Sequence, residues 1–555
     1  MTLYGSTDAS WYRSKLQLRS PISLPLRHLF KRLLRLPPMP RLILTTLLTL
    51  IASFIVYSKR KRNRTAPPGP RGLPIIGNKH QIPKDRQWLQ WAEWAKRYGD
   101  IIQISILGHP VIILSSYKAA TDLLETRGNI YSDRPTAPMA GELVGWARGL
   151  GYTQTSNPRF REFRRLFHQF ADSTPKLIRL LRKLIEDPDN FDAHARNCTS
   201  SSILSLTYGY PSNMGDPLGL VKIAENAMRG FSVASEPGRW WVDILPALKY
   251  LPAWFPGASF HIAARQMRDD LNLLYDVPYN FVKDAIVSGS SNPSFVSSYL
   301  EEKSGKETCD EEQLIQAFGA SLYSGGAETT PSALCSFILA MALNPHVQDQ
   351  AQAELDIVFC SNKSSALPTR LPTLADRDRL PYISALVKEV WRWNPSVPLG
   401  LPHVVTHDDE YRGYSIRKAR GVSHFSSFAE VFLRALLSGP TAILHDEGIF
   451  PDPHVFEPRR YLGADSKPSA TVVTAFGFGR RICPGLHVAE NSVFIAIATI
   501  LAMFRITKAR DPEGKVLEPI VEYDGFICHP RPFKCKIELR SERHAELLDE
   551  DTVEA

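Results

Sequence analysis

The sequence predicts a mainly α-helical protein with a minor β-sheet region, preceded by one N-terminal transmembrane helix. The helices are predicted by long, largely apolar stretches and by stretches with an amphipathic period. These helical stretches cover residues 312–343, 484–504, 161–185 and 345–359. The sheet is predicted by residues 101–116, which are typical of two strands around a turn at Gly108-His109-Pro110. The membrane segment is predicted by an uncharged apolar run at 42–58.

Composition and charge exclude several classes. With 555 residues, 44% of them hydrophobic and 22% charged, the chain is neither disordered nor a coiled coil. Its seven cysteines are scattered without a CxxC pair, so neither a disulfide framework nor a zinc ribbon fits. Residues 1–64 hold 13 basic residues and one acid, a net +12, which leaves −3 for the remainder. A slightly acidic body argues against nucleic-acid binding.

The run at 42–58 contains 17 uncharged residues. As a helix rising about 1.5 Å per residue it is about 25 Å long, the short end of what spans a bilayer. The basic cluster at 59–64 follows directly, and the positive-inside rule keeps that cluster and the body in the cytosol. The alternative is a cleaved signal peptide. The length of the apolar run and the lack of a small-x-small site before the cluster favour the anchor.

The chain therefore divides into five predicted parts. Residues 1–41 form a basic N-terminal extension, and translation from Met39 would leave only Arg41 on the lumenal side of the anchor. The transmembrane anchor covers 42–58, and a basic and proline-rich hinge covers 59–74. One large domain at 75–540 follows, and an acidic C-terminal tail covers 541–555.

The most informative segment of the large domain runs from Phe476 to Gly485. Its glycines permit tight loop geometry around Cys483, and Pro484 suits the first position of the following helix. Arg481 and the start of that helix both favour a thiolate over a thiol. Such a cysteine is a candidate metal ligand or nucleophile. The alternative, a buried cysteine at a helix start, does not explain the whole run.

This run resembles F-x-x-G-x-R-x-C-x-G, the haem-binding loop of the cytochrome P450 superfamily, and matches it at every fixed position. The resemblance covers roughly residues 65–540 and implies the cytochrome P450 fold. It implies that Cys483 is the axial ligand of the iron of haem b and that Arg481 pairs with a haem propionate. The other fixed positions of the loop, expected at the cofactor, are Phe476, Gly479 and Gly485.

Two further motifs occur in the order that the family requires. Glu389 and Arg392 match E-x-x-R and share one face of a helix. This pair alone is uninformative, because most surface helices carry one. Phe456-Glu457-Pro458-Arg459-Arg460-Tyr461 resembles the family segment that completes an ion-pair triad, with Arg460 as the third member. The resemblance implies that this triad is structural and fixes the loop that carries Cys483.

The stretch Gly325-Gly326-Ala327-Glu328-Thr329-Thr330 resembles the oxygen-binding signature of the family. Glycine inside a helix costs about 1 kcal/mol relative to alanine, so we expect Gly325-Gly326, like Pro331, to interrupt the helix. The resemblance implies that Gly326 lets the helix pass close to the haem. It also implies that Glu328 and Thr329 form a catalytic pair that relays protons. A plain helix break with a threonine cap is the alternative.

Two further contacts to the haem propionates are implied less directly. Phe160-Arg161-Glu162-Phe163-Arg164 resembles the W-x-x-x-R helix of the family, with Arg164 in the arginine position and Phe160 replacing the tryptophan. His403 matches a position where many members present a histidine to the haem edge. A surface arginine and a satisfied core histidine are the alternatives.

The resemblance breaks at residues 417–442. Where members of the family carry a short Pro-Lys-Gly strand segment, this chain has 26 residues before it rejoins the pattern at Ile443-Leu444-His445-Asp446. We expect the strand to be lost and its partner to be left without a pair. The hypothesis is a retained intron, because Val422-Ser423 can be encoded by a common 5′ splice-site sequence. A surface insertion is the alternative.

The resemblance implies a microsomal haem-thiolate monooxygenase of the fungal secondary-metabolism type, which oxidises a lipophilic substrate such as a terpenoid or polyketide. Electrons would come from NADPH through a separate cytochrome P450 reductase, with cytochrome b5 as a second candidate donor, since the chain has no flavin or nicotinamide fingerprint. The implied location is the endoplasmic reticulum membrane, single-pass, with a cytosolic catalytic domain. The alternatives are a haem-thiolate isomerase or dehydratase acting on a peroxide, and a non-enzymatic haem-binding protein.

The resemblance also indicates where the substrate pocket lies. The regions expected to line it are 131–158, 210–245, 320–330, 396–402 and 525–530. Aromatic and apolar residues in these regions favour a bulky apolar ligand: Trp146, Trp240, Trp241, Leu399, Leu401 and Phe526.

Overall fold

The computed structural model describes eleven stretches of the chain: 66–74, 76–106, 108–169, 178–211, 216, 218–236, 239–303, 308–360, 368–418, 435–463 and 468–550. The chain divides into two units, Met1–Arg64 and Thr65–Ala555. The predicted extension at 1–41, the anchor at 42–58 and the basic cluster lie outside the described residues. Every described residue belongs to the second unit.

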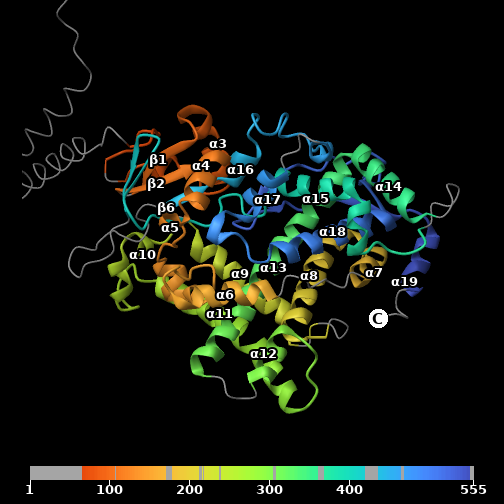
Figure 1. Cartoon of the computed structure of the whole chain (residues 1–555), viewed down its shortest axis with the longest axis horizontal. Helices are drawn as coiled ribbons and strands as arrows, with labels where there is room; N and C mark the ends of the chain where they lie inside the picture. The colour runs from red at the N-terminus through yellow and green to blue at the C-terminus, as the bar shows by residue number, and fades with distance from the viewer. Residues whose placement is uncertain are drawn as a thin grey trace, which may run out of the picture. The chain divides into compact units, whose positions relative to one another are not determined.

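This unit is mainly helical with small sheets, as predicted (Figure 1). The helices are α3 (Gln87–Tyr98), α4 (Tyr117–Ala120), α5 (Gly128–Tyr131), α6 (Pro158–Gln169), α7 (Ile178–Glu186), α8 (Phe191–Tyr208), α9 (Leu220–Ser235), α10 (Trp241–Ile244), α11 (Phe260–Val287), α12 (Phe295–Lys303), α13 (Cys309–Leu343), α14 (Pro345–Phe359), α15 (Pro381–Trp393), α16 (Pro440–Leu444), α17 (Pro468–Phe476), α18 (Leu486–Met503) and α19 (Leu547–Glu550). The strands are β1 (Ile101–Ile106), β2 (His109–Leu114), β3 (His403–Val404), β4 (Asp409–Tyr411), β5 (Tyr414–Ile416), β6 (Ala435–Ser438), β7 (Phe504–Lys508), β8 (Tyr523–Asp524), β9 (His529–Pro530) and β10 (Cys535–Leu539).

Helix α13 runs through the middle of the unit beside α8 (Figure 1). It begins with a capping box between Thr308 and Glu311, which satisfies the first backbone N–H groups. The prediction that Gly325-Gly326 and Pro331 interrupt this helix is wrong, because α13 is continuous over 35 residues. Its C-terminal half is almost wholly buried, and this burial offsets the poor helix propensity of glycine and proline.

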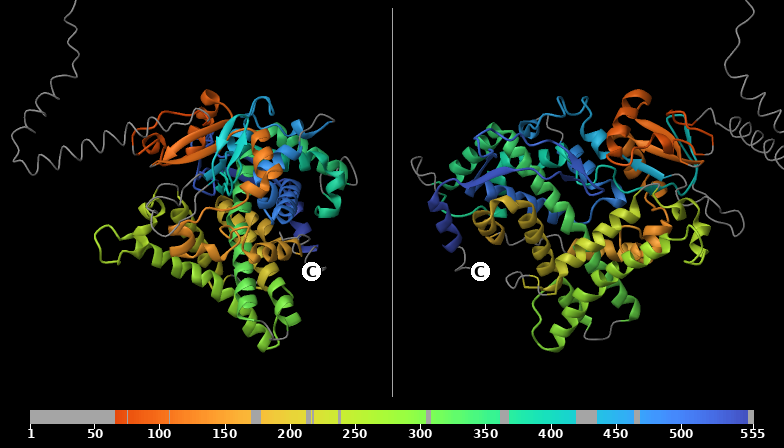
Figure 2. Two further views of the ribbon diagram at one scale, coloured as in Figure 1. Left: turned by 60° about the vertical axis from the view of Figure 1, so that its left-hand side comes forward. Right: turned by 180° about the vertical axis from the view of Figure 1, so that it is seen from behind.

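The apolar core lies on both sides of α13. One cluster joins the C-terminal half of α13 to α14, α15 and α18, and another joins its N-terminal half to α8, α9 and α11. In the views of Figure 2, the strands β1 and β2 and the helices α11 and α12 lie at opposite ends of the unit. Helices α13 and α18 have the length and composition of membrane spans, but 78% and 67% of their apolar windows are buried. They are therefore core helices.

The largest sheet has the strand order β1-β2-β6-β3. Strands β1 and β2 form the predicted hairpin, with Ile101 opposite Leu114 and Ile106 opposite His109. Gly108 in the turn has φ of +88°, which favours glycine. Strand β6 then runs parallel to β2 and antiparallel to β3, with Leu436 opposite both Ile112 and His403.

The expectation that residues 417–442 have lost the strand is therefore wrong. Residues Ala435–Ser438 lie inside this segment and form β6, and α16 begins at Pro440. Leu436 and Leu437 are buried in two different apolar clusters, so the strand is covered on both faces. Strand β2 accordingly has a partner. Residues 419–434 lie outside the described residues.

Three predicted segments have different ends from those expected. The helix at 161–185 is described as α6 and α7, and residues 170–177 between them lie outside the described residues. The helix after Cys483 begins at Leu486, so Pro484 precedes it. At the C-terminus, Leu547 and Leu548 of the predicted tail are buried in the core, so the packed domain extends past residue 540.

The proline-rich stretch that precedes the domain is packed rather than extended into solvent. Gln103 of β1 donates its backbone N–H to the carbonyl oxygen of Pro68 at 2.8 Å. A Cβ at Gly69 would overlap the carbonyl oxygen of the same Gln103, so only glycine fits there. The end of the predicted hinge is thus fixed to the sheet.

Candidate active site

A cavity of about 390 Å³ lies between the loop that carries Cys483 and the middle of α13. All five predicted regions contribute to its wall: three contribute four residues or more, 210–245 contributes Met228 and Phe231, and 525–530 contributes Phe526 and Ile527. Most of the lining is apolar, and its basic side chains are four arginines and a histidine: Arg134, Arg164, Arg480, Arg481 and His403. The sequence-predicted loop and the sequence-predicted helix segment therefore face one cavity.

The loop around Cys483 is held by its own backbone. The N–H of Cys483 donates to the carbonyl oxygen of Phe476 at 2.8 Å, and the Phe476 ring packs edge-on against Trp391 at 4.9 Å. Gly479 has φ of +53°, and a Cβ there would lie 2.5 Å from the carbonyl oxygen of Leu124. Gly485 lies against the sulfur, since a Cβ there would be 3.8 Å from Sγ. These positions fix the thiol in the cavity wall.

The positive charge nearest to the thiol comes from Arg164 on α6. Its Nη1 donates to the carbonyl oxygen of Ile482 at 2.6 Å. Burial raises the pKa of the Cys483 thiol, while a backbone hydrogen bond from Gly485 and the charge of Arg164 oppose that rise. The prediction that Arg481 favours the thiolate of Cys483 is wrong, because its guanidinium is bound to the carbonyl oxygens of Ser132 and Thr153. A buried thiol of this kind becomes a thiolate when it coordinates a metal ion.

Arg481 lies along the cavity wall with its side chain 4% exposed. Its Nε and Nη2 donate to the carbonyl oxygens of Ser132 and Thr153, each at 2.7 Å. Its guanidinium lies 4.3 Å from the ring centre of Phe160, in a cation–π contact. Phe160, which replaces the tryptophan of the family motif, thus supports this arginine.

His403 lies on β3 in the cavity wall and is buried. Its Nδ1 is 2.8 Å from the carbonyl oxygen of Tyr131. Burial and the charge of Arg134 lower its pKa well below the ordinary value. His403 is therefore an uncharged group that faces the cavity.

Arg134 is a cavity residue that the sequence did not reveal. Its Nη1 donates to the carbonyl oxygens of Leu401 and Pro402, both at 2.8 Å. Its buried Nε has no hydrogen-bond partner among the described residues. Burial, together with the charge of Arg481, lowers its pKa to about 9. No pattern around Arg134 marks it in the sequence, because its role depends on residues far along the chain.

The two glycines of α13 face different surroundings. A Cβ at Gly325 would meet nothing within 4 Å, so this position opens onto the cavity. A Cβ at Gly326 would overlap Cδ1 of Ile203 on α8. A side chain at the second position would therefore displace Ile203 of α8, while the first position leaves space for a ligand.

The predicted catalytic pair is divided between two surroundings. Thr329 lines the cavity, and its Oγ1 donates to the carbonyl oxygen of Gly325 at 2.8 Å. Glu328 faces α8 and β9, where Arg196 Nη1 lies 2.6 Å and His529 Nε2 lies 3.1 Å from its Oε2. Burial raises the pKa of Glu328, but the contact with His529 and the charge of Arg196 outweigh burial and lower it. The sequence revealed neither partner.

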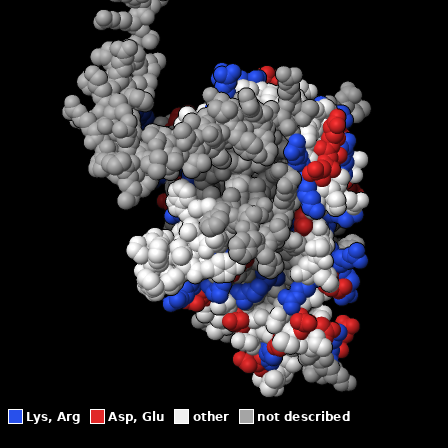
Figure 3. All heavy atoms as spheres, turned by 90° about the vertical axis from the view of Figure 1, so that its left-hand side faces the viewer, with Lys and Arg blue, Asp and Glu red and all other residues white. Residues whose placement is uncertain are grey.

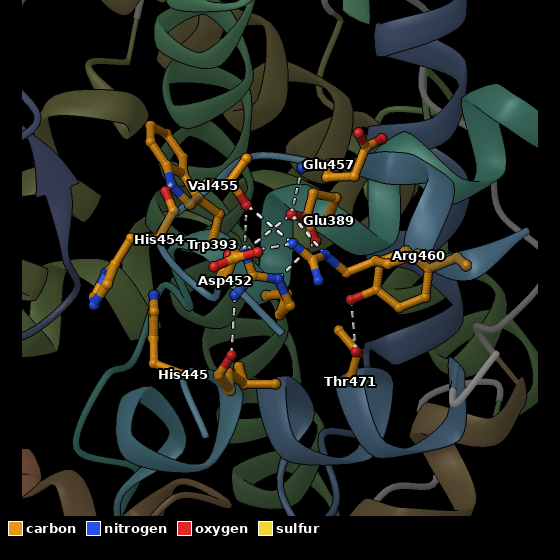
Figure 4. A network of polar contacts seen from close by, with 12 residues as sticks. Glu389, Trp393, His445, Asp452, His454, Val455, Glu457, Arg460 and Thr471 are labelled. Carbon is orange, nitrogen blue, oxygen red and sulfur yellow. Dashed lines mark hydrogen bonds and ion pairs between the residues drawn. The ribbon is translucent and has the colours of Figure 1, made fainter. Parts of the chain in front are cut away.

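The structure brings the three residues of the predicted triad together (Figure 4). Arg392 donates from Nε and Nη2 to the two oxygens of Glu389, at 2.6 and 2.9 Å. Arg460 Nε lies 3.2 Å from Oε1 of the same carboxylate. The backbone N–H of Glu457 also donates to Glu389 at 2.8 Å. This network ties α15 to the segment before α17, which leads into the cysteine loop.

A cluster of three aromatic side chains forms part of the cavity wall. Phe231 of α9 packs against Trp146 at 4.9 Å and against Phe526 at 5.6 Å, both nearly edge-on. Trp146, Phe526 and Leu401 line the cavity as predicted. The other three predicted lining residues lie elsewhere: Trp240 donates to the carbonyl oxygen of Val233, Trp241 is 58% exposed, and Leu399 packs under the sheet.

Comparison with known proteins decides the family. Residues 67–537 match the family model described as "Cytochrome P450". The chain belongs to the cytochrome P450 family. The chain is 41% identical to cytochrome P450 monooxygenase 208 of Postia placenta, covering 89% of this chain and 94% of that protein. It is 38% identical to cytochrome P450 monooxygenase claR of Ampulloclitocybe clavipes, over 90% of each chain.

A third relative has a named substrate. Tryptamine 4-monooxygenase of Psilocybe cyanescens is 36% identical, over 90% of this chain and 98% of that protein. All three relatives are fungal proteins with monooxygenase names. As a cytochrome P450, the protein is an oxidoreductase whose family binds haem through a cysteine thiolate.

The residues present fit that group. A thiol in the cavity wall supplies the ligand, and Gly325 leaves open space on the facing helix. Haem carries two carboxylates, and the cavity wall supplies buried arginines, one of them with a buried Nε that lacks a partner among the described residues. Buried arginines of this kind fit an anionic group.

Proposed function

We propose that this cytochrome P450 is a haem-thiolate monooxygenase that inserts one oxygen atom from O2 into a C–H or C=C bond of a lipophilic small molecule. The observation that carries this proposal is the single cavity lined both by Cys483 and by Thr329. A ligand for haem iron and a hydroxyl that can direct a proton thus face the same space.

Haem b would be held by the thiolate of Cys483 at its iron and by Arg164, Arg481, His403 and Arg134 at its carboxylates. The loop positions Phe476, Gly479 and Gly485 shape the cradle for the sulfur, and the triad of Glu389, Arg392 and Arg460 keeps the loop in place. When bound, haem supplies oxygen activation, which a thiolate ligand promotes. Electrons would come from NADPH through a separate reductase, with cytochrome b5 as a second candidate donor.

The chain's own contribution to the chemistry is proton delivery and the exclusion of water. Thr329 presents its hydroxyl to the cavity, and releasing its bond to Gly325 would free that hydroxyl to donate. Glu328, one residue earlier on α13, would supply the proton. The largely apolar wall keeps bulk water from the reacting atoms.

The substrate we propose is a bulky, largely apolar molecule. The edge-on rings of Trp146, Phe231 and Phe526 offer apolar surface from three different segments. The pathway we propose is secondary metabolism, such as terpenoid or polyketide synthesis; the relatives are fungal monooxygenases, and the one whose name gives a substrate is a tryptamine 4-monooxygenase. Metabolite profiling of a strain that lacks the gene tests this assignment: an unchanged profile of lipophilic metabolites would contradict it.

We further propose that the enzyme is anchored in the endoplasmic reticulum membrane by residues 42–58, with the catalytic domain in the cytosol. Exposed apolar residues from α10 to the first turn of α11 support contact with a membrane: Trp241, Tyr250, Trp254, Phe255 and Ile262. Figure 3 views the side of the molecule near α10, where uncharged side chains adjoin basic ones. Carbonate extraction of microsomes tests the anchor, which should keep the full chain in the pellet and release a chain lacking 1–58.

The isomerase or dehydratase alternative is less well supported, because the pair Glu328-Thr329 that oxygen activation uses is intact. A non-enzymatic haem carrier would need neither the open space at Gly325 nor an aromatic pocket. A difference spectrum recorded on adding lipophilic compounds separates the carrier from the enzymes. Displacement of water from the iron indicates a substrate site.

The decisive experiment replaces Cys483, the proposed ligand of the haem iron. Cys483→Ser should abolish the red-shifted Soret band of the reduced carbon monoxide complex, because an alcohol is a far weaker ligand than a thiolate. Cys309→Ser, at an exposed cysteine at the start of α13, is the matched control and should keep the band. A Cys483→Ser protein that kept both the band and turnover would refute the proposed function.

A further inference from the structure

Glu328, Arg196 and His529 form a closed ring of three polar contacts. Arg196 Nη1 lies 2.6 Å and His529 Nε2 lies 3.1 Å from Oε2 of Glu328. Arg196 Nη2 lies 3.1 Å from Nδ1 of His529. The three side chains come from α13, α8 and β9, and each is mostly buried, with 16%, 25% and 17% of the side chain exposed. Three elements thus converge on one carboxylate.

The ring assigns the proton on His529. A guanidinium only donates hydrogen bonds, so the Nδ1 that faces Arg196 must accept and carries no proton. The ring proton of a neutral His529 then lies on Nε2, which is 3.1 Å from Oε2 of Glu328 without meeting hydrogen-bond geometry. His529 therefore presents an N–H group to the Glu328 carboxylate as an electrostatic contact, and Arg196 sets its tautomer.

His529 is fixed by the turn that forms part of the cavity wall. Phe526 and Ile527, in the turn between β8 and β9, line the cavity. The next residue, Cys528, is held on both sides: its N–H donates to the carbonyl oxygen of Ser396 at 2.8 Å, and its carbonyl accepts from Ser332 Oγ of α13 at 2.6 Å. A rigid connection of three residues therefore joins the wall that a substrate touches to the group that holds Glu328.

We propose that His529 is a positioning residue for Glu328: the β8–β9 turn, whose Phe526 and Ile527 line the cavity, fixes His529 beside the carboxylate and so orients it for proton delivery. This inference rests on the proposed function and adds a control of proton delivery by the β8–β9 turn. Arg196 alone cannot provide this coupling, because it lies on α8, outside the turn.

The ring also indicates that His529 positions Glu328 rather than relaying protons. To pass a proton on, the imidazole must take one up at Nδ1 as it releases one from Nε2. The N–H of Arg196 occupies Nδ1. Because uptake would first require this contact to break, the arrangement favours a fixed donor.

Two substitutions of His529 separate these roles. His529→Leu removes the donor. His529→Gln keeps both contacts, because its amide N–H can donate to Glu328 and its amide oxygen can accept from Arg196. With the haem-loaded full chain and a reductase, we expect His529→Leu to slow NADPH oxidation at least about tenfold, since a well-placed proton donor typically contributes about 10²-fold or more. His529→Gln should restore most of this rate.

A matched control lies on the same hairpin. Arg531 pairs with Glu522 at 2.8 Å and contacts none of the three side chains of the ring, so Arg531→Leu disturbs the hairpin without removing a contact to Glu328. It should leave the NADPH oxidation rate unchanged. If Arg531→Leu slowed oxidation as much as His529→Leu, or if His529→Gln were as slow as His529→Leu, the positioning role would be refuted.

A second measurement does not depend on activity. The thermal unfolding midpoints of wild type, His529→Leu, Glu328→Gln and the double variant form a cycle. We expect the losses to be clearly non-additive, because once Glu328 is uncharged the donor on His529 has less to stabilise. Additive losses would show that the two residues do not interact and would overturn the inference. All variants should retain the red-shifted carbon monoxide band, so this result is distinguishable from a failure of the proposed function.

Discussion

Arg392 and Glu389 face each other across one turn of α15 with their Nε and Oε2 atoms 2.6 Å apart, and neither side chain is exposed. A pair this deeply buried is costly to break, because the partner that remains is a charge without compensation. Here the second arginine, Arg460, depends on the same carboxylate. Removing Glu389 would therefore leave two cations together in the interior.

The first prediction concerns this network. Glu389→Gln should lower the free energy of unfolding by about 3–5 kcal/mol and reduce haem incorporation. Chemical denaturation of the purified protein measures the first effect, and haem content per chain measures the second. Glu162→Gln, which breaks an exposed pair with Arg165, is the control and should cost less than about 1 kcal/mol. Equal losses in both variants would contradict a structural role for the triad.

A second prediction concerns the contact between α13 and α8. Gly326→Ala should lower stability by about 1–3 kcal/mol, because the added methyl group overlaps Ile203 and overpacks the interface. Gly325→Ala should leave stability unchanged or raise it by up to about 1 kcal/mol, since its methyl group enters open space. Thermal unfolding of both variants checks this difference. Ile203→Ala should recover part of the loss in Gly326→Ala, and a failure to do so would place the strain elsewhere.

A third prediction is a pH dependence that arises at Asp243 of α10. This carboxyl is buried and accepts a hydrogen bond from the backbone N–H of Met139 at 2.8 Å. Burial raises its pKa from 3.8 to about 7, with a smaller contribution from Glu142 and against the effect of the Met139 bond. Between these two values the folded protein holds a proton that the unfolded chain releases. The contribution of Asp243 to the free energy of unfolding is therefore lost as the pH rises toward 7.

Asp243→Asn tests this assignment, because the amide oxygen can still accept from Met139 while the side chain no longer titrates. The thermal midpoint of wild type should fall more steeply than that of Asp243→Asn between pH 5 and pH 8. Parallel curves for the two proteins would show that Asp243 is not the group responsible.

A fourth prediction separates oxygen activation from cofactor binding. Thr329→Ala should keep nearly normal haem content while electrons from NADPH are diverted to hydrogen peroxide, because proton delivery in the cavity becomes disordered. The ratio of peroxide formed to NADPH oxidised measures this. Thr499→Ala on α18 is the matched control, since Thr499 makes the same bond to its own helix, to Ile495 at 2.7 Å, and is buried. An unchanged ratio in Thr329→Ala would argue against its role.

A fifth prediction concerns the anomalous segment. Because β6 and α16 use residues 435–444, we expect any retained intron to lie before Ala435. The mature transcript should therefore encode Ala435–Ser438, whether or not it encodes 419–434. Leu436→Ala should cost about 2–5 kcal/mol, as for other fully buried leucines. A transcript that lacks codons for 435–438 would mean that another segment forms this strand.

The parts of the site that the sequence predicted are those encoded in short contiguous runs. The loop from Phe476 to Gly485 and the stretch from Gly325 to Thr330 carry their own geometry, so residue type and spacing were sufficient. Arg134, Arg196 and His529 were missed because each acts through a partner far away in the chain, and no local pattern marks such a contact. Strand β6 was missed because four residues in an unfamiliar segment carry little signal on their own.

The errors at α13 and at Arg481 have a different origin. Local propensity predicted a break at Gly325-Gly326, but tertiary burial decided the outcome, since Ile203 fills the space that a side chain would need. Proximity in the sequence predicted that Arg481 would stabilise the thiolate. The chain instead turns this arginine onto Phe160 and brings in Arg164 from α6.

The two adjacent glycines of α13 have opposite consequences for how this enzyme can evolve. A single codon change at Gly325 alters the volume beside the cavity without disturbing the fold, so selection for a new substrate can act there cheaply. A change at Gly326 displaces Cδ1 of Ile203, on another helix, and so carries a cost in stability that a change at Ile203 can relieve. Diversification of substrate range should therefore proceed more readily through the first position than through the second, although the two are neighbours in the gene.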